Sequence, residues 1–541
     1  MPAFLRALPR AVTRPFSILA LIAWGAVMVA LVYRSYLQAS SATLATDLAR
    51  YGSAAVWRGV YYRGEKIGFT VSQTVAKDDG FELQEDGRLQ MSLFGATTAA
   101  TIHTTARVDA HFTLHAFEFS LDPGTGPVAV SGQVAGRRLT LSVTTSGGTR
   151  TEERELVEPP ELSLNLSRRL ANGGLVPGTR HQWTVFDPAT LRNAPVVVDV
   201  GRRELVRGVG VPVPAFRVEM EFAGLRTTSW VTDTGEVVRE ESPLGLITQR
   251  ESAENARATA VSSRAQTDLL QSAAVVPVTK ARIDEPRDVR RLRLRLNGAD
   301  LSSPDLQGVG QSVQGDVVEI QDPQSLRAGR ADPDAARFLA PEAFLESDAP
   351  EIIAEAKIAV RGVTGNRARA ERLTRYVNGL LEKKPTVSLP SAREVLRTKV
   401  GDCNEHTALY VAMARALGIP SRIAVGLVYV HGAFYYHAWP EAYVDEGAGR
   451  GLWLPVDPTL NQFPADGTHL RLARGGLDKQ TVILPLIGRL KITVLDLELA
   501  PNATPILAGR QPADLGRLAI PIPQRESRCA CSSQPSPADR R

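Results

Sequence analysis

Apolar and polar residues alternate along most of the chain between residues 57 and 250. Gly, Asp and Pro interrupt this alternation about every ten residues, for example at 78–80, 86–87 and 122–124. A period of two is typical of antiparallel strands that bury one face. We therefore predict a β-rich region over residues 50–265, folded as a sandwich or an open barrel. The pattern leaves open whether the region is one large domain or two small ones.

The apolar spacing becomes helical in the second half of the chain. Ser347 and Pro350 supply a cap residue and a first-turn proline, and Ser391 with Glu394 forms a capping box. Gly418 ends the last helix, because a proline follows closely and cannot continue it. The predicted helices cover residues 350–360, 367–381, a short segment after Ser391, and residues 404–417.

Short apolar runs after the last helix are predicted to be strands joined by tight turns. They cover residues 422–430, 434–444 and 452–456, and a closing strand is indicated at 490–494. Helices and antiparallel strands that follow one another in separate blocks predict an α+β fold.

Residues 266–344 are rich in Pro, Asp, Arg and Gly, and they are predicted to form a connector with short strands. Within this connector, residues 287–296 alternate Arg with apolar residues, which predicts a strand with an exposed basic face. We expect this strand at a sheet edge, paired with residues 317–320. The alternative for its basic face is contact with anionic headgroups.

Residues 16–33 contain no charged residue and, at about 1.5 Å per residue, span roughly 27 Å, close to the thickness of a bilayer core. Arginines precede this run at positions 6, 10 and 14, whereas only Arg34 follows closely. The positive-inside rule therefore places the N-terminus in the cytoplasm and the rest of the chain beyond an inner membrane. The alternatives are a cleaved signal peptide, because small residues follow at 39–45, and a buried helix of a soluble domain.

The patterns together predict six segments. They are a cytoplasmic tail at 1–14, a single membrane helix at 15–34, the β-rich region at 50–265, the connector at 266–344, an α+β domain at 345–500, and a tail at 501–541. The tail is rich in Pro, Arg and Ser and is predicted to be disordered.

Composition narrows the classes of function. The chain has 541 residues, of which 43% are apolar and 22% charged, as is ordinary for a globular protein of several domains. The net charge of +5 is small for this length, and no basic stripe interleaves with aromatic residues, so no nucleic-acid partner is expected. Three cysteines do not make a disulfide framework, and two of them, Cys529 and Cys531, lie in the polar tail.

The remaining cysteine, Cys403, is predicted at a helix N-terminus, where the helix dipole and unpaired N–H groups favour a thiolate. His437 falls in a predicted strand, and Asp457 falls at the end of the next one. Adjacent strands can bring His437 and Asp457 together, and a helix across the sheet can bring Cys403 to the other imidazole nitrogen. The candidate catalytic residues are therefore Cys403 as nucleophile, His437 as base and Asp457 as the carboxylate that orients it. The alternative is a buried structural cysteine.

Three further histidines, His103, His111 and His115, lie close together in the β-rich region. No carboxylate or thiol joins them at ligand spacing, so we expect solvated strand histidines and not a metal site. No metal and no cofactor are predicted anywhere in the chain.

Other polar and aromatic residues near the candidate residues have structural interpretations. His406 is expected on the surface of its helix or in the core, and Arg422 is expected to pack or pair at the start of its strand. Trp439 and Tyr443 are expected to wall a cleft or to pack, and residues 461–469 are expected to form a rim of the cleft.

Short sequence blocks around the candidate residues are more specific than the residue types alone. Gly-Asp-Cys403 precedes Asn-Glu-His-Thr-Ala-Leu, and then come Ala-Arg-Ala-Leu-Gly-Ile-Pro-Ser-Arg, His437-Ala-Trp-Pro-Glu-Ala-Tyr and Asp457-Pro-Thr. In this order and spacing, over about residues 345–495, they resemble bacterial members of the transglutaminase-like superfamily. The resemblance implies a papain-like α+β core, a Cys-His-Asp triad at Cys403, His437 and Asp457, and acyl transfer through a thioester formed from an amide.

The chain differs from animal transglutaminases, because Asn404 stands where they have an aromatic residue and their calcium loops are not recognisable. A calcium-dependent crosslinker is therefore not expected. The resemblance and the N-terminal run together suggest a membrane-anchored, periplasmic amide hydrolase (a cysteine protease or amidase) or acyltransferase acting on proteins or peptides. The open alternatives are a protein-glutamine crosslinking transferase and a non-catalytic binding or assembly module. The β-rich region could bind an envelope protein.

Overall fold

The structure is a computed structural model that describes residues 55–507, with gaps at 94–95, 125, 146, 208–210, 223, 259–267, 387, 477–478, 480 and 502–505. The predicted segments at 1–14 and 15–34, and most of the tail at 501–541, lie outside the described residues. Within the described ranges, no helix is both long and apolar enough to cross a membrane.

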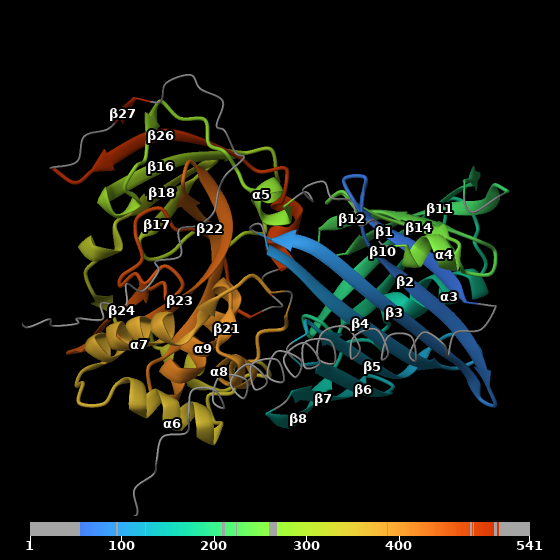
Figure 1. The fold of residues 1–541 in the computed structure, drawn as a ribbon, viewed down its shortest axis with the longest axis horizontal. Helices are drawn as coiled ribbons and strands as arrows, with labels where there is room; N and C mark the ends of the chain where they lie inside the picture. Colours follow the sequence, from blue (N-terminus) through green and yellow to red (C-terminus); the bar gives the residue numbers. More distant parts are fainter. Residues whose placement is uncertain are drawn as a thin grey trace, which may run out of the picture.

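The β-rich region forms one antiparallel sheet of 14 strands, which occupies the right half of Figure 1. Consecutive strands pair along two arms, β1 to β8 and β9 to β14, and β1 joins the arms by pairing with β14. The strands are β1 Val56–Tyr62, β2 Glu65–Lys77, β3 Gly80–Leu93, β4 Ala96–Val108, β5 Leu114–Asp122, β6 Val128–Ala135, β7 Arg138–Thr145, β8 Gly148–Glu155, β9 Arg180–Asp187, β10 Arg192–Val206, β11 Val213–Phe222, β12 Leu225–Val231, β13 Val237–Glu241 and β14 Leu246–Glu251.

Alternate residues of these strands face a shared core, as the period of two predicts. In β7, Leu139, Leu141 and Val143 are buried, and the residues between them are more exposed. Helix α3 (Ser163–Asn172) connects β8 to β9 and buries Leu166 and Leu170 against the second arm of the sheet.

The predicted break at 86–87 does not form, because β3 runs straight through it. Asp86 lies opposite His103 on β4 and binds its Nδ1 atom at 2.5 Å. The side chain that suggested a turn therefore has a cross-strand partner instead. His103 is paired with a carboxylate and is not simply solvated, whereas His111 and His115 are exposed.

Part of the connector forms a second sheet together with a strand from near the end of the described chain. Its order is β17-β18-β16-β26, with β16 Val289–Asn297, β17 Gln311–Gln314, β18 Val317–Gln321 and β26 Lys491–Leu499. The predicted pairing of β16 with β18 is confirmed, but the predicted edge position of β16 is wrong, because β26 pairs with its other side. The basic face meets acids on both neighbours, as in Arg293 with Glu319 and Arg291 with Asp496.

The second half of the chain packs helices on a five-stranded antiparallel sheet of order β19-β24-β23-β22-β25 (Figure 1). The helices are α6 Pro350–Ala359, α7 Asn366–Leu380, α8 Ala392–Thr398 and α9 Cys403–Ala416, close to the predicted ranges. The strands are β19 Gly329–Arg330, β22 Ser421–Val430, β23 Ala433–Gly447, β24 Arg450–Pro455 and β25 Leu470–Arg474. The predicted α+β arrangement is therefore present, although the predicted strand at 490–494 closes the second sheet and not this one.

Helix α9 lies at the centre of this half. Its residues 405–415 are all buried, and they pack against β22, β23 and the other three helices. A helix that is buried all round belongs to a core and has no solvent face. The described residues also contain the short elements α4 Ala253–Arg257, α5 Leu269–Ala273, β15 Ala281–Arg282, β20 Glu382–Lys383, β21 Val400–Gly401 and β27 Ile506–Leu507, and four short 3-10 helices.

The large sheet packs directly against this α+β part. Phe344, before α6, and Leu389, before α8, are each 8% exposed and belong to the same buried cluster as Phe117 and Leu139 of the large sheet. Apolar burial of this kind fixes the relative position of two units. The β-rich region therefore stands next to the helices that carry the candidate residues.

Candidate active site

Cys403 is the first residue of α9, and the local sequence explains why the helix begins there. The carboxylate of Asp402 accepts the N–H of Asn404 at 2.9 Å, and Glu405 accepts the N–H of Asp402 at 2.8 Å, which completes a capping box. Gly401 makes room for this box, because a Cβ atom there would lie 2.2 Å from the Cβ atom of Glu405. The start of α9 therefore explains two residues of the Gly-Asp-Cys block: Asp402 caps the helix, and Gly401 leaves room for Glu405.

His437 lies within β23, and Asp457 follows the end of the paired strand β24. The Nε2 atom of His437 donates to Oδ2 of Asp457 at 2.8 Å. The other carboxylate oxygen, Oδ1, accepts the N–H of Leu460 at 2.8 Å. The side chain of Asp457 is 0% exposed and that of His437 is 8% exposed. The carboxylate therefore fixes the tautomer of His437 and leaves its Nδ1 atom for another partner.

Packing of α9 across β23 brings Cys403 to the same place. Ala438 follows His437 in β23, and its main-chain N–H lies close enough to the sulfur of Cys403 to act against the rise in the pKa of the thiol. The carbonyl of Ala438 accepts the hydroxyl of Thr407 at 3.1 Å. Because Cys403 and Thr407 are one turn apart on α9, the two contacts fix the start of the helix on the strand. The three predicted residues therefore gather around one backbone position.

A second histidine binds Asp457 and was missed by sequence reasoning. The Nε2 atom of His469 lies 3.2 Å from Oδ2 of Asp457, and its Nδ1 atom lies 3.1 Å from Oδ1 of Asp466. Burial opposes a charge on His469, but the two carboxylates outweigh it and raise its pKa to about 10. Burial alone would raise the pKa of Asp457, but His437 and His469 together hold it well below its usual range. Asp457 is therefore an ionised carboxylate.

Residues 461–469 do not form a rim, so that prediction was wrong. Asp466, Thr468 and His469 are at most 5% exposed, and His469 contacts Asp457 in the interior of the protein. Asp466 is held by Gln462, whose amide donates to it at 2.8 Å. A polar segment with Pro and Gly looks like a surface loop, and the only signal against this was an acid three residues before a histidine.

Cys403 was predicted to favour the thiolate, but its surroundings in the structure favour the neutral thiol. Cys403 is half-buried at the helix start. Burial raises its pKa well above the usual value, and the Asp402 and Glu405 carboxyls raise it further. Burial and Glu405 also raise the pKa of Asp402 well above its usual value. The two acids of the capping box thus lie beside the thiol, and the negative charge that they share opposes the helix dipole. The resting thiol is neutral, and its proton needs a base.

His406 lies in the core, one of the two positions expected for it. It is fully buried, and its Nδ1 atom binds the carbonyl of Asp402 at 2.6 Å. Its Nε2 atom is buried and has no hydrogen-bond partner among the described residues. Burial and the charge of Lys383 lower the pKa of His406. Lys383 lies on β20 and pairs with Gly401 of β21. Its ammonium group interacts electrostatically with Asp457, which places a basic residue at the edge of the site.

The neighbouring aromatic and basic residues pack in the protein interior. Trp439 and Tyr443 are both buried, and the ring of Trp439 lies edge-on to His469 at 5.0 Å. Arg422 forms an ion pair of 2.7 Å with the buried carboxylate of Glu441, which confirms the expectation that it pairs at the start of its strand. These contacts form the support behind β23.

His437, Asp457 and His469 offer ligand atoms within 4.8 Å of one another, close enough together to hold a metal ion. Each imidazole N–H already donates to the shared carboxylate, so a cation would have to replace two hydrogen bonds. We assign the cluster to hydrogen bonding, and the absence of a metal stays a prediction.

Comparison with known families matches this geometry. Residues 355–458 fit the family model of the transglutaminase-like superfamily, and the matched range contains Cys403, His437 and Asp457. This part of the chain belongs to that superfamily. The matched transglutaminase-like core begins within α6 and ends just after β24. No curated protein matches the chain.

Several solved structures show broad likeness. A cysteine protease candidate from Cytophaga hutchinsonii is 17% identical, with 41% of this chain and 90% of that chain covered at a TM-score of 0.27. The periplasmic domain of TgpA from Pseudomonas aeruginosa, bound to ethylmercury, is 20% identical, with 32% and 77% covered at 0.24. A β-barrel-like protein of unknown function from Brucella abortus is 12% identical, with 36% and 94% covered at 0.30.

Proposed function

We propose that this protein is a thiol-dependent amide hydrolase or acyltransferase that acts on protein or peptide substrates through a thioester acyl-enzyme. The single observation that carries the proposal is the hydrogen bond of 2.8 Å between His437 and the buried carboxylate of Asp457, formed beside the thiol of Cys403. A base held in one tautomer next to a neutral thiol is the arrangement that nucleophilic catalysis needs.

The steps follow from these atoms. The Nδ1 atom of His437 takes the proton of Cys403 as the sulfur attacks the amide carbonyl. Asp457 stabilises the imidazolium, and the main-chain N–H of Cys403 at the helix start is the candidate donor to the oxyanion. The imidazolium returns its proton to the leaving amine, and the thioester remains. Water, activated by the same imidazole, then releases the acid and restores the thiol.

Hydrolysis is the preferred outcome because water is always present and the sequence shows no amine-binding feature. Amine transfer and a non-catalytic role are the alternatives that the experiment must separate. The proposed location is the periplasmic side of an inner membrane, with the chain held by residues 15–34, and it is supported by the uncharged run and the arginines before it.

The experiment has two arms. Full-length protein and His437→Ala are treated with iodoacetamide, and the labelling rates of Cys403, Cys529 and Cys531 are compared by peptide mass spectrometry. We expect the labelling rate of Cys403 at neutral pH to fall in the variant, whereas the labelling rates of Cys529 and Cys531 should not change. Equal rates for all three cysteines, unaffected by the variant, would contradict the enzyme. In the second arm, a glutamine peptide and a labelled primary amine are added, and amine incorporation would favour transfer over hydrolysis.

A further inference from the structure

His469 stands directly before β25, and the register of the five-stranded sheet brings it close to His437. Strand β22 lies between β23 and β25, and its Gly426 pairs with His437 on one side and with Arg471 on the other. A Cβ atom on Gly426 would lie 2.0 Å from the carbonyl oxygen of Leu470, so the close approach of β25 requires a glycine there. As a result, the centres of the two imidazole rings are 6.0 Å apart.

Both ring nitrogens of His469 face groups that can only accept hydrogen bonds. Nε2 lies 3.2 Å from Oδ2 of Asp457, and Nδ1 lies 3.1 Å from Oδ1 of Asp466 and 3.2 Å from its main-chain carbonyl. Both carboxyl groups have lowered pKa values and are ionised. A neutral imidazole would set its lone pair against one of these oxygens, so the contacts require an imidazolium.

The two histidines on Asp457 are not equivalent. His437 gives one nitrogen to the carboxylate and leaves its Nδ1 atom for another partner, whereas His469 has both nitrogens bound. Oδ2 of Asp457 accepts from both rings, and Oδ1 accepts the N–H of Leu460, so the carboxylate is held in one orientation. The side chain of His469 is 2% exposed. It is therefore a fixed charge that acts through Asp457, and not a second base for a substrate.

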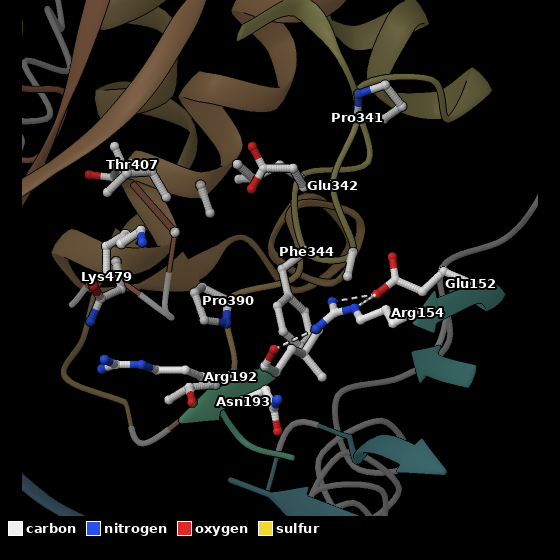
Figure 2. A pocket seen from close by; sticks show the side chains of 18 residues that line it. Glu152, Arg154, Arg192, Asn193, Pro341, Glu342, Phe344, Pro390, Thr407 and Lys479 are labelled. Carbon is white, nitrogen blue, oxygen red and sulfur yellow. Dashed lines mark hydrogen bonds and ion pairs between the residues drawn. The ribbon is translucent and has the colours of Figure 1, made fainter. Parts of the chain in front are cut away.

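The two rings share a buried aromatic neighbour and lie away from the largest cavity. Trp439 is 1% exposed, and its ring stacks on His437 at 6.1 Å and lies edge-on to His469 at 5.0 Å. A cavity of about 550 Å³ beside the large sheet reaches Thr407 of α9, as Figure 2 shows, but neither imidazole is among its lining residues. A charge in such surroundings is screened less than a charge at the surface.

We infer that His469 is a positioning residue: through Asp457 it holds His437 in its orientation and favours the uncharged form of that imidazole, which is the form that can take a proton. The inference rests on the proposed function and adds to it a fixed positive charge. Without His469, the negative charge of Asp457 would act on His437 alone and would favour the imidazolium. The positive ring offsets that charge and leaves the orienting hydrogen bond in place.

The size of the effect follows from the distance between the rings. Two unit charges about 6 Å apart, at an effective dielectric constant of about 20 to 40, change a proton equilibrium by roughly one to two pH units. Removal of the positive charge makes the first proton lost from the Cys403–His437 pair harder to remove, whichever of the two groups releases it. The acid limb of the pH–rate profile of the thiol should therefore move to higher pH.

The test measures alkylation of Cys403 by iodoacetamide on the full chain, at a series of pH values from about 5 to about 9. Peptide mass spectrometry gives the rate at Cys403, and Cys529 and Cys531 serve as internal references. His469→Gln removes the charge and keeps an N–H donor toward Asp457. We expect the midpoint of its acid limb to lie about one to two pH units above that of the wild type.

Two variants separate charge from fit. His469→Lys keeps a positive charge between the two carboxylates, and its midpoint should stay within about half a pH unit of the wild type. Gln462→Leu loosens the same segment without removing a charge, because Gln462 binds the side chain and the N–H of Asp466 at 2.8 and 2.9 Å. Its midpoint should not move upward even where its rate falls.

The other titratable groups around the pair are unchanged in these variants. They are Asp402 and Glu405 at the start of α9, the uncharged His406 on α9, Lys383 on β20, Asp466 before β25, and Glu441 on β23 with Arg422 and Arg471. An upward shift that occurs in His469→Gln and not in Gln462→Leu therefore belongs to the charge of His469.

The charge of His469 is also measured without any substitution. Exchange of the imidazole C2 hydrogen for deuterium, followed by peptide mass spectrometry, gives a titration midpoint for the histidines of the wild type. We expect His469 to titrate above about pH 9, because its two carboxylates retain the proton. A midpoint near the ordinary value of about 6.5 would overturn the inference, and this result does not depend on the folding of His469→Gln.

The outcomes separate this inference from the proposed function. A folded His469→Gln protein with the wild-type midpoint, or an equal upward shift in Gln462→Leu, would overturn the role of His469 and leave the thiol chemistry standing. If wild-type Cys403 reacts no faster than the tail cysteines at every pH, and His437→Ala makes no difference, the proposed function fails and the role of His469 falls with it.

Discussion

Replacement of His469 by Gln is the sharpest test of the buried support under Asp457. His469 lies between two carboxylates, which raise its pKa from the ordinary 6.5 to about 10. At about 1.4 kcal/mol for each tenfold change, the charged imidazole contributes roughly 5 kcal/mol to the stability of the folded state. Because the folded-state pKa is the higher one, this contribution is complete below pH 6.5. It is lost as the pH rises through about 10, and roughly half remains near pH 8.

The assay is urea unfolding of wild type and His469→Gln, followed by tryptophan fluorescence at a series of pH values from 6 to about 10. We expect the difference in unfolding free energy between the two proteins to be largest at the acid end and to shrink steadily toward the alkaline end. His431→Gln is the matched control, since His431 is exposed in a turn. A difference that stays constant over the range, or the same trend in the control, would refute a charged His469.

Three further substitutions probe other parts of the site. Asp457→Asn should lower kcat by about three to four orders of magnitude, because the orienting carboxylate is lost; steady-state kinetics on an accepted peptide measures this, and a loss below tenfold would contradict it. Glu405→Gln keeps the cap but removes a negative group near Cys403, so alkylation by iodoacetamide at neutral pH should become faster; an unchanged rate would show that the acid does not act on the thiol. Glu441→Gln leaves buried arginines without their counterion and should cost about 3 to 5 kcal/mol in urea unfolding, so a loss under 1 kcal/mol would count against this ion pair.

Local signals were sufficient where the structure depends on neighbours in sequence. The helix starts near Pro350 and Cys403, the turn at His431 and the strands on either side of it follow from caps, turn residues and apolar period. The meeting of His437 with Asp457 could also be predicted, because the two strands that carry them are consecutive and antiparallel.

Contacts between distant segments could not be predicted in the same way. The basic strand β16 looked like an edge because its second partner, β26, lies far along the chain. His469 looked like part of a surface loop because its two partners become visible only when the segment folds under Asp457.

The thiol of Cys403 shows a third kind of limit. A helix N-terminus favours a thiolate when it is considered alone, and Asp402 was visible in the sequence as the residue before it. The sequence could not show that the carboxyl groups of Asp402 and Glu405 lie close to the sulfur of Cys403 and are shielded from water. The balance between a dipole and a buried acid depends on solvent access, which is a property of the fold.

The central claim is that Cys403 forms a thioester with an amide-derived acyl group, and trapping that species tests it most directly. Full-length protein is incubated with a cell-envelope extract, quenched in acid, digested and examined by mass spectrometry. We predict an added mass on the Cys403 peptide that hydroxylamine removes and that is absent from His437→Ala. A wild-type protein that is folded yet carries no such adduct, while its cysteine remains a free thiol, would contradict the account.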